Sequence, residues 1–273
     1  MSAAPGLSRT ADLPALRALW RQAFGDPDEV IGQFFTDAWT PEGMFVLRDG
    51  ERLLAMAAWF PATLCEGRRG WQAAYLYAVA TDESARHRGC CRQLLDFASG
   101  WLTGRGVKCL CLVPGSEELY RFYEKLGYAR LFTRGLLTCP AVPTDGTASP
   151  AGAPEYLAER EALLAGRTYL SYPVPVLEYQ RKLAGLGGGG LFLLSRGGRT
   201  GCACAASDGG RAVIYELLWP GDPAEGAAMV LAALGAKTAE VRVPEGGEPF
   251  GMIRWLIPQP PALSAGYLGL AFD

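Results

Sequence analysis

The stretch Tyr75–Leu95, YLYAVATDESARHRGCCRQLL, passes from a strand through a polar turn into a helix. Aromatic and β-branched residues dominate its start, which is typical of a strand, and apolar positions from Leu94 onward recur at helical spacing. Between them, Arg86–Arg92 contains three arginines and no acid. Because the first N–H groups of a helix are unpaired and its dipole is positive there, this turn is typical of a diphosphate site.

The elements around this stretch predict a mixed α/β fold in which a β–α–β crossover follows a hairpin. The hairpin turn is Arg48-Asp49-Gly50-Glu51, which carries an Asp-Gly signal. In the last helix, Ser116 is the expected N-cap and Leu119, Phe122 and Leu126 the inner face. The expected elements are helices at 12–24 and 26–35, strands at 44–47, 52–64 and 71–80, a helix at 91–102, a strand at 107–113, a helix at 116–126 and a strand at 130–137.

The second half is expected to repeat this order in a smaller α/β domain. Residues 140–154 are rich in Pro, Gly, Ala, Ser and Thr and predict a linker between domains at 1–139 and 155–273. The expected elements are helices at 155–164 and 174–183, strands at 191–195, 201–206 and 212–219, a helix at 223–234, a strand at 239–243, a helix at 250–255 and a strand at 267–272.

Composition narrows the function of this 273-residue, 29.2 kDa chain. A net charge of −2 argues against sequence-independent nucleic-acid binding, which needs a clustered positive surface. No apolar run approaches the roughly 20 residues of a membrane helix, and the N-terminus has no secretory pattern, so we expect a cytoplasmic protein. The spacing of the eight cysteines and the single histidine, His87, predicts reduced thiols and no metal site.

Known phosphate signatures can be compared directly with the arginine-rich turn. GxxxxGKS or GxxxxGKT is absent, and no GxGxxG follows a strand. Arg86-His87-Arg88-Gly89-Cys90-Cys91 instead resembles the signature of the acetyl-CoA-dependent N-acetyltransferase (GNAT) superfamily, in which Gln or Arg precedes a glycine by three positions. Cys91 replaces the usual final Gly or Ala. The resemblance covers roughly Leu13–Leu137 and includes Tyr123-Glu124-Lys125-Leu126-Gly127-Tyr128.

The resemblance implies a fold and a cofactor, acetyl-CoA as co-substrate. In the family, the fourth strand splays from the fifth, and the pantetheine arm pairs with its backbone while the following loop holds the pyrophosphate. Because the cofactor pairs with backbone N–H and C=O groups, this binding does not depend on which side chains the strand carries. The implied cofactor-binding residues are Tyr77, Ala78, Val79 and Ala80 on the strand, and Arg86, His87, Arg88, Gly89, Cys90, Cys91 and Arg92 in the loop.

The resemblance also assigns Tyr123 as the catalytic acid that protonates the departing thiolate. A phenol with a pKa of about 10 is protonated at neutral pH. Core packing is the alternative role of Tyr123, and Tyr120 is the second choice as acid. No general base is assigned, because Asp82 and Glu83 lie in a solvated turn and His87 in the phosphate loop. Trp39, Trp59 and Phe60 are candidates to line the acceptor site or the core.

We therefore expect an N-acetyltransferase that moves an acetyl group directly from acetyl-CoA to a primary amine of a small molecule or a protein. One alternative is a CoA-binding sensor or interaction module without turnover. Another is an acyltransferase that uses a longer acyl donor. Asp222 stands where the second half should carry arginines, so that half is expected to be a degenerate acetyltransferase-like domain. The expected partner is the amine acceptor, and we expect the protein to bind neither nucleic acid nor a membrane. The oligomeric state is left open, with a homodimer as one option.

Overall fold

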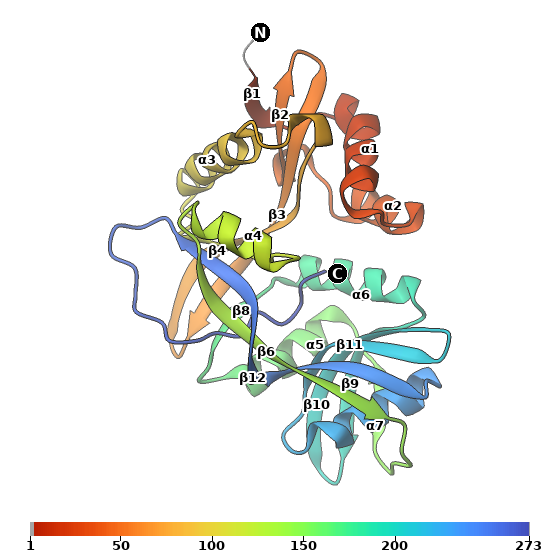
Figure 1. The fold of residues 1–273 in the computed structure, drawn as a ribbon. Coiled ribbons are helices and arrows are strands. Elements are labelled where there is room, and N and C mark those ends of the chain that lie inside the picture. The colour runs from red at the N-terminus through yellow and green to blue at the C-terminus, as the bar shows by residue number, and fades with distance from the viewer. Residues whose placement is uncertain (1–2, 273) are drawn as a thin grey trace. The chain divides into compact units, whose positions relative to one another are not determined.

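The computed structural model describes residues 3–272 and divides into two compact units (Figure 1). Strand β4 (Arg69–Thr81) belongs to the first unit from Trp71 onward. Unit 1 comprises the chain up to Ala62, Trp71–Ala129 and Ile253–Pro260. Unit 2 comprises Thr63–Gly70, Arg130–Met252 and the chain from Pro261 onwards. Each unit therefore includes a segment from the other half of the sequence.

The sheet of unit 1 has the order β1-β2-β3-β4-β5, followed by the end of β12. Its pairing is antiparallel between β1, β2 and β3, and parallel between β4 and β5. The strands are β1 (Ala4–Leu7), β2 (Met44–Asp49), β3 (Arg52–Glu66), β4 and β5 (Cys109–Leu112). The helices are η1 (Thr10–Asp12), α1 (Leu13–Phe24), α2 (Asp28–Asp37), η2 (Pro41–Gly43), η3 (Glu83–Ala85), α3 (Cys90–Thr103) and α4 (Glu117–Glu124).

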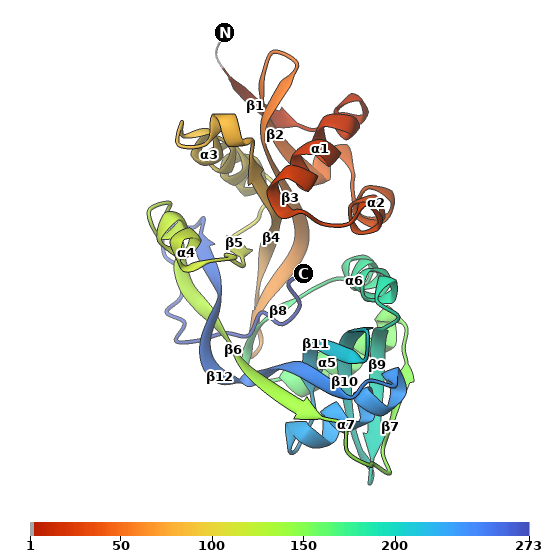
Figure 2. The same ribbon diagram turned by 45° about the vertical axis from the view of Figure 1, so that its right-hand side comes forward.

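Helices cover both faces of this sheet, as Figure 2 shows. On one face, Trp20 of α1 and Phe34 of α2 both contact the ring of Tyr77 in β4, at 5.5 and 5.8 Å between centroids. On the other face, Phe45 of β2 packs against Trp101 of α3 at 5.3 Å. The apolar stripes that predicted these helices therefore bury their side chains against the sheet.

The structure confirms the predicted hairpin and crossover. Gly50 has a φ of 61° in the turn between β2 and β3, a conformation that glycine adopts without steric cost. Ser116 caps α4, since its side chain accepts a hydrogen bond from the Leu119 amide at 3.3 Å. The predicted inner face is confirmed at Leu126, which is 7% exposed, and is wrong at Leu119, which is 41% exposed. Tyr120 and Tyr123 of α4 are buried. The sheet thus receives the two tyrosines, three residues apart, in place of Leu119.

The strand order continues in unit 2 as β12-β11-β10-β9-β7, so all twelve strands belong to one hydrogen-bonded sheet. In it, β6 pairs with β12, and β8 pairs with residues 63–66 of β3. The strands are β6 (Ala129–Pro140), β7 (Thr147–Pro150), β8 (Thr168–Ser171), β9 (Gly190–Arg196), β10 (Arg199–Asp208), β11 (Arg211–Leu218) and β12 (Thr238–Trp255). The helices are α5 (Ala153–Leu164), α6 (Val174–Leu186) and α7 (Pro223–Leu234).

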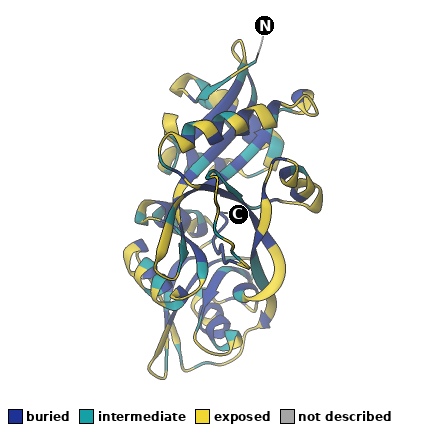
Figure 3. Cartoon of the chain, turned by 90° about the vertical axis from the view of Figure 1, so that its left-hand side faces the viewer, coloured by how far each residue is buried: buried dark blue, intermediate teal, exposed yellow. Residues whose placement is uncertain are grey.

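Helix α7 supplies the centre of the core of unit 2. Met229 and Val230 pack with Ala203 of β10 and Ile214 of β11 in one buried cluster. In Figure 3, dark blue buried residues lie inside each unit, and exposed residues on the outward turns of the helices are yellow. This helix has the bounds that its apolar residues predicted.

Three segments of unit 2 differ from their predictions. The expected linker 140–154 contains β7, which pairs with β9 from Thr147 opposite Ser195 to Pro150 opposite Phe192. The expected helix 250–255 is part of β12, because pairing with distant strands outweighs local helix preference. The expected strand 267–272 is reduced to an isolated bridge between Tyr169 and Tyr267. None of the helices within residues 3–272 has the length and apolar character that a bilayer crossing demands.

Candidate functional site

Strands β4 and β5 pair for only three residues and then separate. Their parallel register runs from Ala73 opposite Cys109 to Tyr75 opposite Cys111, and β5 ends at Leu112. Strand β4 continues to Thr81, so the predicted segment Tyr77–Ala80 lies beyond the last pair. Within it, Ala78 has a φ of 49°, in the left-handed region that costs a residue with a side chain roughly 1–2 kcal/mol. The backbone of β4 therefore departs from regular sheet geometry just where its partner strand is lost.

The turn after β4 has a backbone shape suited to an anion. His87 and Gly89 have φ values of 62° and 78°, and such left-handed turns point successive N–H groups into one concavity. A Cβ built on Gly89 would meet nothing within 4 Å, so conformation and not crowding explains the glycine. The sequence predicted this glycine as part of the phosphate loop.

Helix α3 begins directly after Gly89 without a side-chain cap. The amide of Gln93 donates to the Gly89 carbonyl at 3.0 Å, so the amides of Cys90, Cys91 and Arg92 belong to the unpaired first turn. By contrast, α4 and α7 are capped by Ser116 and Asp222. The start of α3 thus presents N–H groups and a positive dipole end to a ligand.

Positive side chains surround this helix start. Arg86, His87, Arg88 and Arg92 are all exposed. Arg86 donates from Nε to the Thr81 carbonyl at 3.4 Å, and its Nη2 lies 3.8 Å from a Glu83 oxygen. Because both side chains of that pair are solvated, the contact is weak and can yield to a stronger anion.

The carboxylate of Asp82, in the same turn, is held by hydrogen bonds from Ser84 and Arg52. Asp82 accepts hydrogen bonds from the Ser84 amide at 3.1 Å and from Arg52 at 2.8 Å. The hydrogen bond from the Ser84 hydroxyl, with smaller effects of the Ser84 amide and Arg52, lowers the pKa of Asp82. Its carboxylate therefore stabilises the turn.

Tyr123 lies on the buried face of α4 and is 6% exposed. Burial raises its pKa well above 10, and the neighbouring Cys91, Tyr128 and Tyr75 raise it further. Tyr123 therefore shares its surroundings with Tyr75, at the last β4–β5 pair, and with Cys91, in the first turn of α3. The hydroxyl stays protonated at neutral pH and can act as a proton donor.

The same surroundings include residues that sequence reasoning missed. The thiol of Cys91 shares a hydrogen bond with Thr81, and burial raises the pKa of Cys91 to about 12. The ring of Tyr128 lies 5.5 Å from that of Tyr123. Tyr75 and Thr81 lie on β4, whereas Tyr123 and Tyr128 lie on and just after α4, so the spacing of the sequence carried no signal that the two pairs are close together.

The three aromatic candidates for an acceptor site are not brought together. Phe60 stacks on Tyr77 at 5.5 Å between centroids. Trp59 points to the other face of the sheet, where its ring lies 6.0 Å from that of Trp101. The indole of Trp39 donates to the Ser8 hydroxyl at 3.1 Å. Phe60 thus belongs to the aromatic cluster around Tyr77, whereas Trp59 packs on the opposite face.

Comparisons with known proteins agree with this geometry. Residues 7–131 match the family model of the acetyltransferase (GNAT) domain. A probable N-acyltransferase of unknown function from Enterococcus faecalis V583 is 16% identical, with a TM-score of 0.71 over 94% of this chain and 73% of that chain. A GCN5-related N-acetyltransferase from Kribbella flavida is 16% identical, with a TM-score of 0.68 over 93% and 72%.

A shorter solved chain covers nearly the same residues. A putative acetyltransferase from Pyrococcus horikoshii is 14% identical, with a TM-score of 0.64 over 93% of this chain and 89% of that chain. At such identities the likeness establishes the fold, which extends through both halves of the chain. The sequence matches no curated protein.

Proposed function

The domain of residues 7–131 belongs to the acetyltransferase (GNAT) family, and on that premise we propose that this chain is an N-acetyltransferase. It moves an acetyl group from acetyl-CoA to a primary amine of a small molecule or a protein, by direct transfer. One observation carries this proposal. Strand β4 loses its partner after Tyr75 and leads into the uncapped start of α3 among exposed arginines.

The described residues fit coenzyme A. The backbone of Tyr77, Ala78, Val79 and Ala80 can bind the pantetheine amides, because these residues lie beyond the β4–β5 register. The turn and helix start at 86–92 can bind the pyrophosphate through the unpaired amides, the left-handed Gly89 and the arginines. When bound, acetyl-CoA supplies the thioester carbonyl for attack by the amine and a thiolate as leaving group.

Tyr123 holds the proton that such a leaving group needs. Its hydroxyl is neutral across the physiological range because burial opposes ionisation. Strand β4 carries no carboxylate, so we propose that the amine loses its proton to water. In the balanced reaction, a C–N bond forms, the C–S bond breaks, and sulfur gains the Tyr123 proton. The amine proton is released to solvent, and the Tyr123 oxygen takes a proton back from solvent.

The compartment follows from the thiols. All eight cysteines lie in the described part of the chain, and none of them forms a disulfide there. Eight reduced thiols support a reducing compartment, and we place the reaction in the cytoplasm.

The test is to mix the full chain with acetyl-CoA and a panel of primary amines and to follow free CoA thiol. Amine-dependent thiol release, with the acetylated amine detected by mass spectrometry, is the expected result. CoA binding in calorimetry without thiol release for any amine would instead establish a CoA-binding module without turnover. Release that rises with acyl-chain length, from acetyl-CoA to longer acyl-CoA donors, would reassign the donor.

A further inference from the structure

Unit 2 contains a second parallel pair of strands that separates as β4 and β5 do. Strands β11 and β12 pair from Arg211 opposite Thr238 to Ile214 opposite Val241. Strand β11 then runs on to Leu218 and leads through a short turn into α7, as β4 leads into α3. The second half therefore repeats the strand separation of the first.

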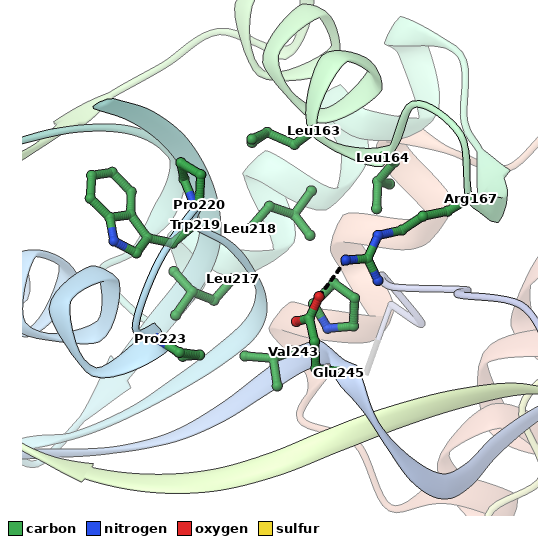
Figure 4. A pocket seen from close by; sticks show the side chains of 11 residues that line it. Leu163, Leu164, Arg167, Leu217, Leu218, Trp219, Pro220, Pro223, Val243 and Glu245 are labelled. Carbon is green, nitrogen blue, oxygen red and sulfur yellow. Dashed lines mark hydrogen bonds and ion pairs between the residues drawn. The ribbon is translucent and has the colours of Figure 1, made fainter. Parts of the chain in front are cut away.

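A cavity of about 230 Å³ lies beside the separated ends of these strands (Figure 4). Leu217 and Leu218 of β11 and Val243 of β12 line it, together with Leu163 of α5. Pro220 of the turn after β11, Pro223 of α7 and Pro244 of β12 contribute further apolar surface. Nine of the eleven lining residues are apolar, and the other two, Arg167 and Glu245, are charged. A volume of roughly 150 Å³ is already enough to hold a benzene-sized molecule.

The first turn of α7, beside this cavity, is not available to a phosphate group. Asp222 accepts a hydrogen bond from the Ala224 amide at 2.9 Å, and Pro223 has no amide hydrogen. Glu225 adds a carboxylate in the first turn and is paired with Arg199 at 2.9 Å. The chain's own carboxylates thus occupy the position that an anion could take at α3, so a ligand of this cavity carries no diphosphate there.

The polar groups at the cavity edge favour a different anion. Arg167 pairs with Glu245 through Nη2, and the two side chains are 46% and 61% exposed (Figure 4). An ion pair so exposed contributes little free energy. The guanidinium has five donors in a planar fork, and a carboxylate can use the edge that Glu245 does not engage.

We propose that this cavity binds a small apolar carboxylate, such as a medium-chain fatty acid. The hydrocarbon chain fills the leucine-lined space, and the carboxylate binds Arg167 at the edge. The cavity is smaller than the roughly 300 Å³ at which drug-sized sites begin, which fits a single short chain. This site lies within unit 2 and does not depend on acetyl transfer.

The test uses isothermal titration calorimetry of the full chain with sodium octanoate and with 1-octanol, which has the same chain and no charge. Octanoate is expected to bind more tightly than octanol. Arg167→Gln should weaken octanoate binding about 10-fold or more and leave octanol binding unchanged. Arg211→Gln, at another arginine of unit 2 that pairs with Glu240 at 3.7 Å, is the matched control and should change neither.

A second variant tests the cavity itself. Leu163→Trp adds bulk at a half-buried lining position and should abolish binding of both probes, while CoA affinity stays unchanged and reports a folded chain. No octanoate binding by the wild-type chain, equal loss of both probes in Arg167→Gln, or retained binding in a folded Leu163→Trp would each overturn the proposal. Should Leu163→Trp fail to fold, Leu163→Phe takes its place. Because acetyl transfer is assayed separately, failure here leaves the proposed function standing.

Discussion

Tyr75 lies opposite Cys111 in the last pair of the β4–β5 register, and Tyr75 is also an electrostatic neighbour of Tyr123. The proposed proton donor is therefore located where the two strands begin to separate. Cys91, from the first turn of α3, is a further neighbour of Tyr123. The proposed acid, the strand separation and the helix start thus belong to one site.

Tyr123→Phe should lower kcat by roughly 10²–10⁴-fold, the usual contribution of a positioned general acid, and leave CoA affinity nearly unchanged. Steady-state kinetics and calorimetry measure the two quantities. Tyr120→Phe is the matched control, because Tyr120 is also buried on α4 but one turn earlier. Loss of CoA affinity with intact turnover would reject the assignment of Tyr123.

The pH profile gives an independent measure of the same residue. The protonated form of Tyr123 is the active one, and its pKa is raised by burial, so loss of activity through its ionisation moves to higher pH. We expect no decline in kcat from this group between pH 7 and about 10, the pKa of an ordinary phenol. A decline centred below that value and absent in Tyr123→Phe would contradict the raised pKa.

Gly89→Ala should weaken CoA binding as well as reduce stability. Its φ of 78° costs a residue with a Cβ about 1–2 kcal/mol, and relaxing that strain would move the amides that start α3. Gly50→Ala is a close control, since Gly50 has a φ of 61° in a hairpin turn and also has open space around it. Both variants should lose similar stability in urea unfolding, and only Gly89→Ala should lose CoA affinity. Equal CoA affinities in the two variants would argue against the role of this turn.

A buried ion pair dominates the polar interior of unit 2. Arg160 donates from Nε to Glu216 at 2.8 Å and from Nη1 to the Leu170 carbonyl at 3.0 Å, and the side chains of Arg160 and Glu216 are 0% exposed. Arg160→Met leaves the buried carboxylate without a cation and should cost about 3–5 kcal/mol of unfolding free energy. Arg21→Ala, at a pair whose side chains are 53% and 78% exposed, should cost no more than about 1 kcal/mol.

Chemical denaturation monitored by circular dichroism measures both stability effects. The double variant Arg160→Met/Glu216→Leu removes both charges, so it should recover part of the loss. A double variant less stable than Arg160→Met alone would show that the carboxylate does not require its cation.

The sequence predicted the parts of the fold that depend on local patterns. The Asp-Gly turn at Gly50, the cap at Ser116 and the bounds of α7 all follow from short-range chemistry. Pairing between strands that are far apart in the sequence could not be predicted from such local patterns. The segment 250–255 joins β12, and Thr168–Ser171 forms β8, because each pairs with strands far away in the sequence.

The candidate site likewise has one part that local sequence patterns predicted and one part that they did not. The turn from Arg86 to Gly89 could be located because its glycine and arginines are contiguous with the start of a helix. The neighbourhood of Tyr123 could not, because helical phase decides whether Leu119 or Tyr120 faces the sheet, and α4 is only eight residues long. A small rotation of so short a helix exchanges its faces, and only packing against the sheet selects one.

The central claim is that the turn and helix start at residues 86–92 bind the pyrophosphate of CoA, and calorimetric titration of CoA into Arg86→Ala/Arg88→Ala measures this most directly. We predict affinity at least about 10-fold weaker than in the wild type and a shallower dependence on salt, because charge-assisted bonds are lost. Arg121→Ala, at an exposed arginine of α4 that lies 3.9 Å from Glu117, should bind CoA as the wild type does. Unchanged CoA affinity and salt dependence in the double variant would contradict the account.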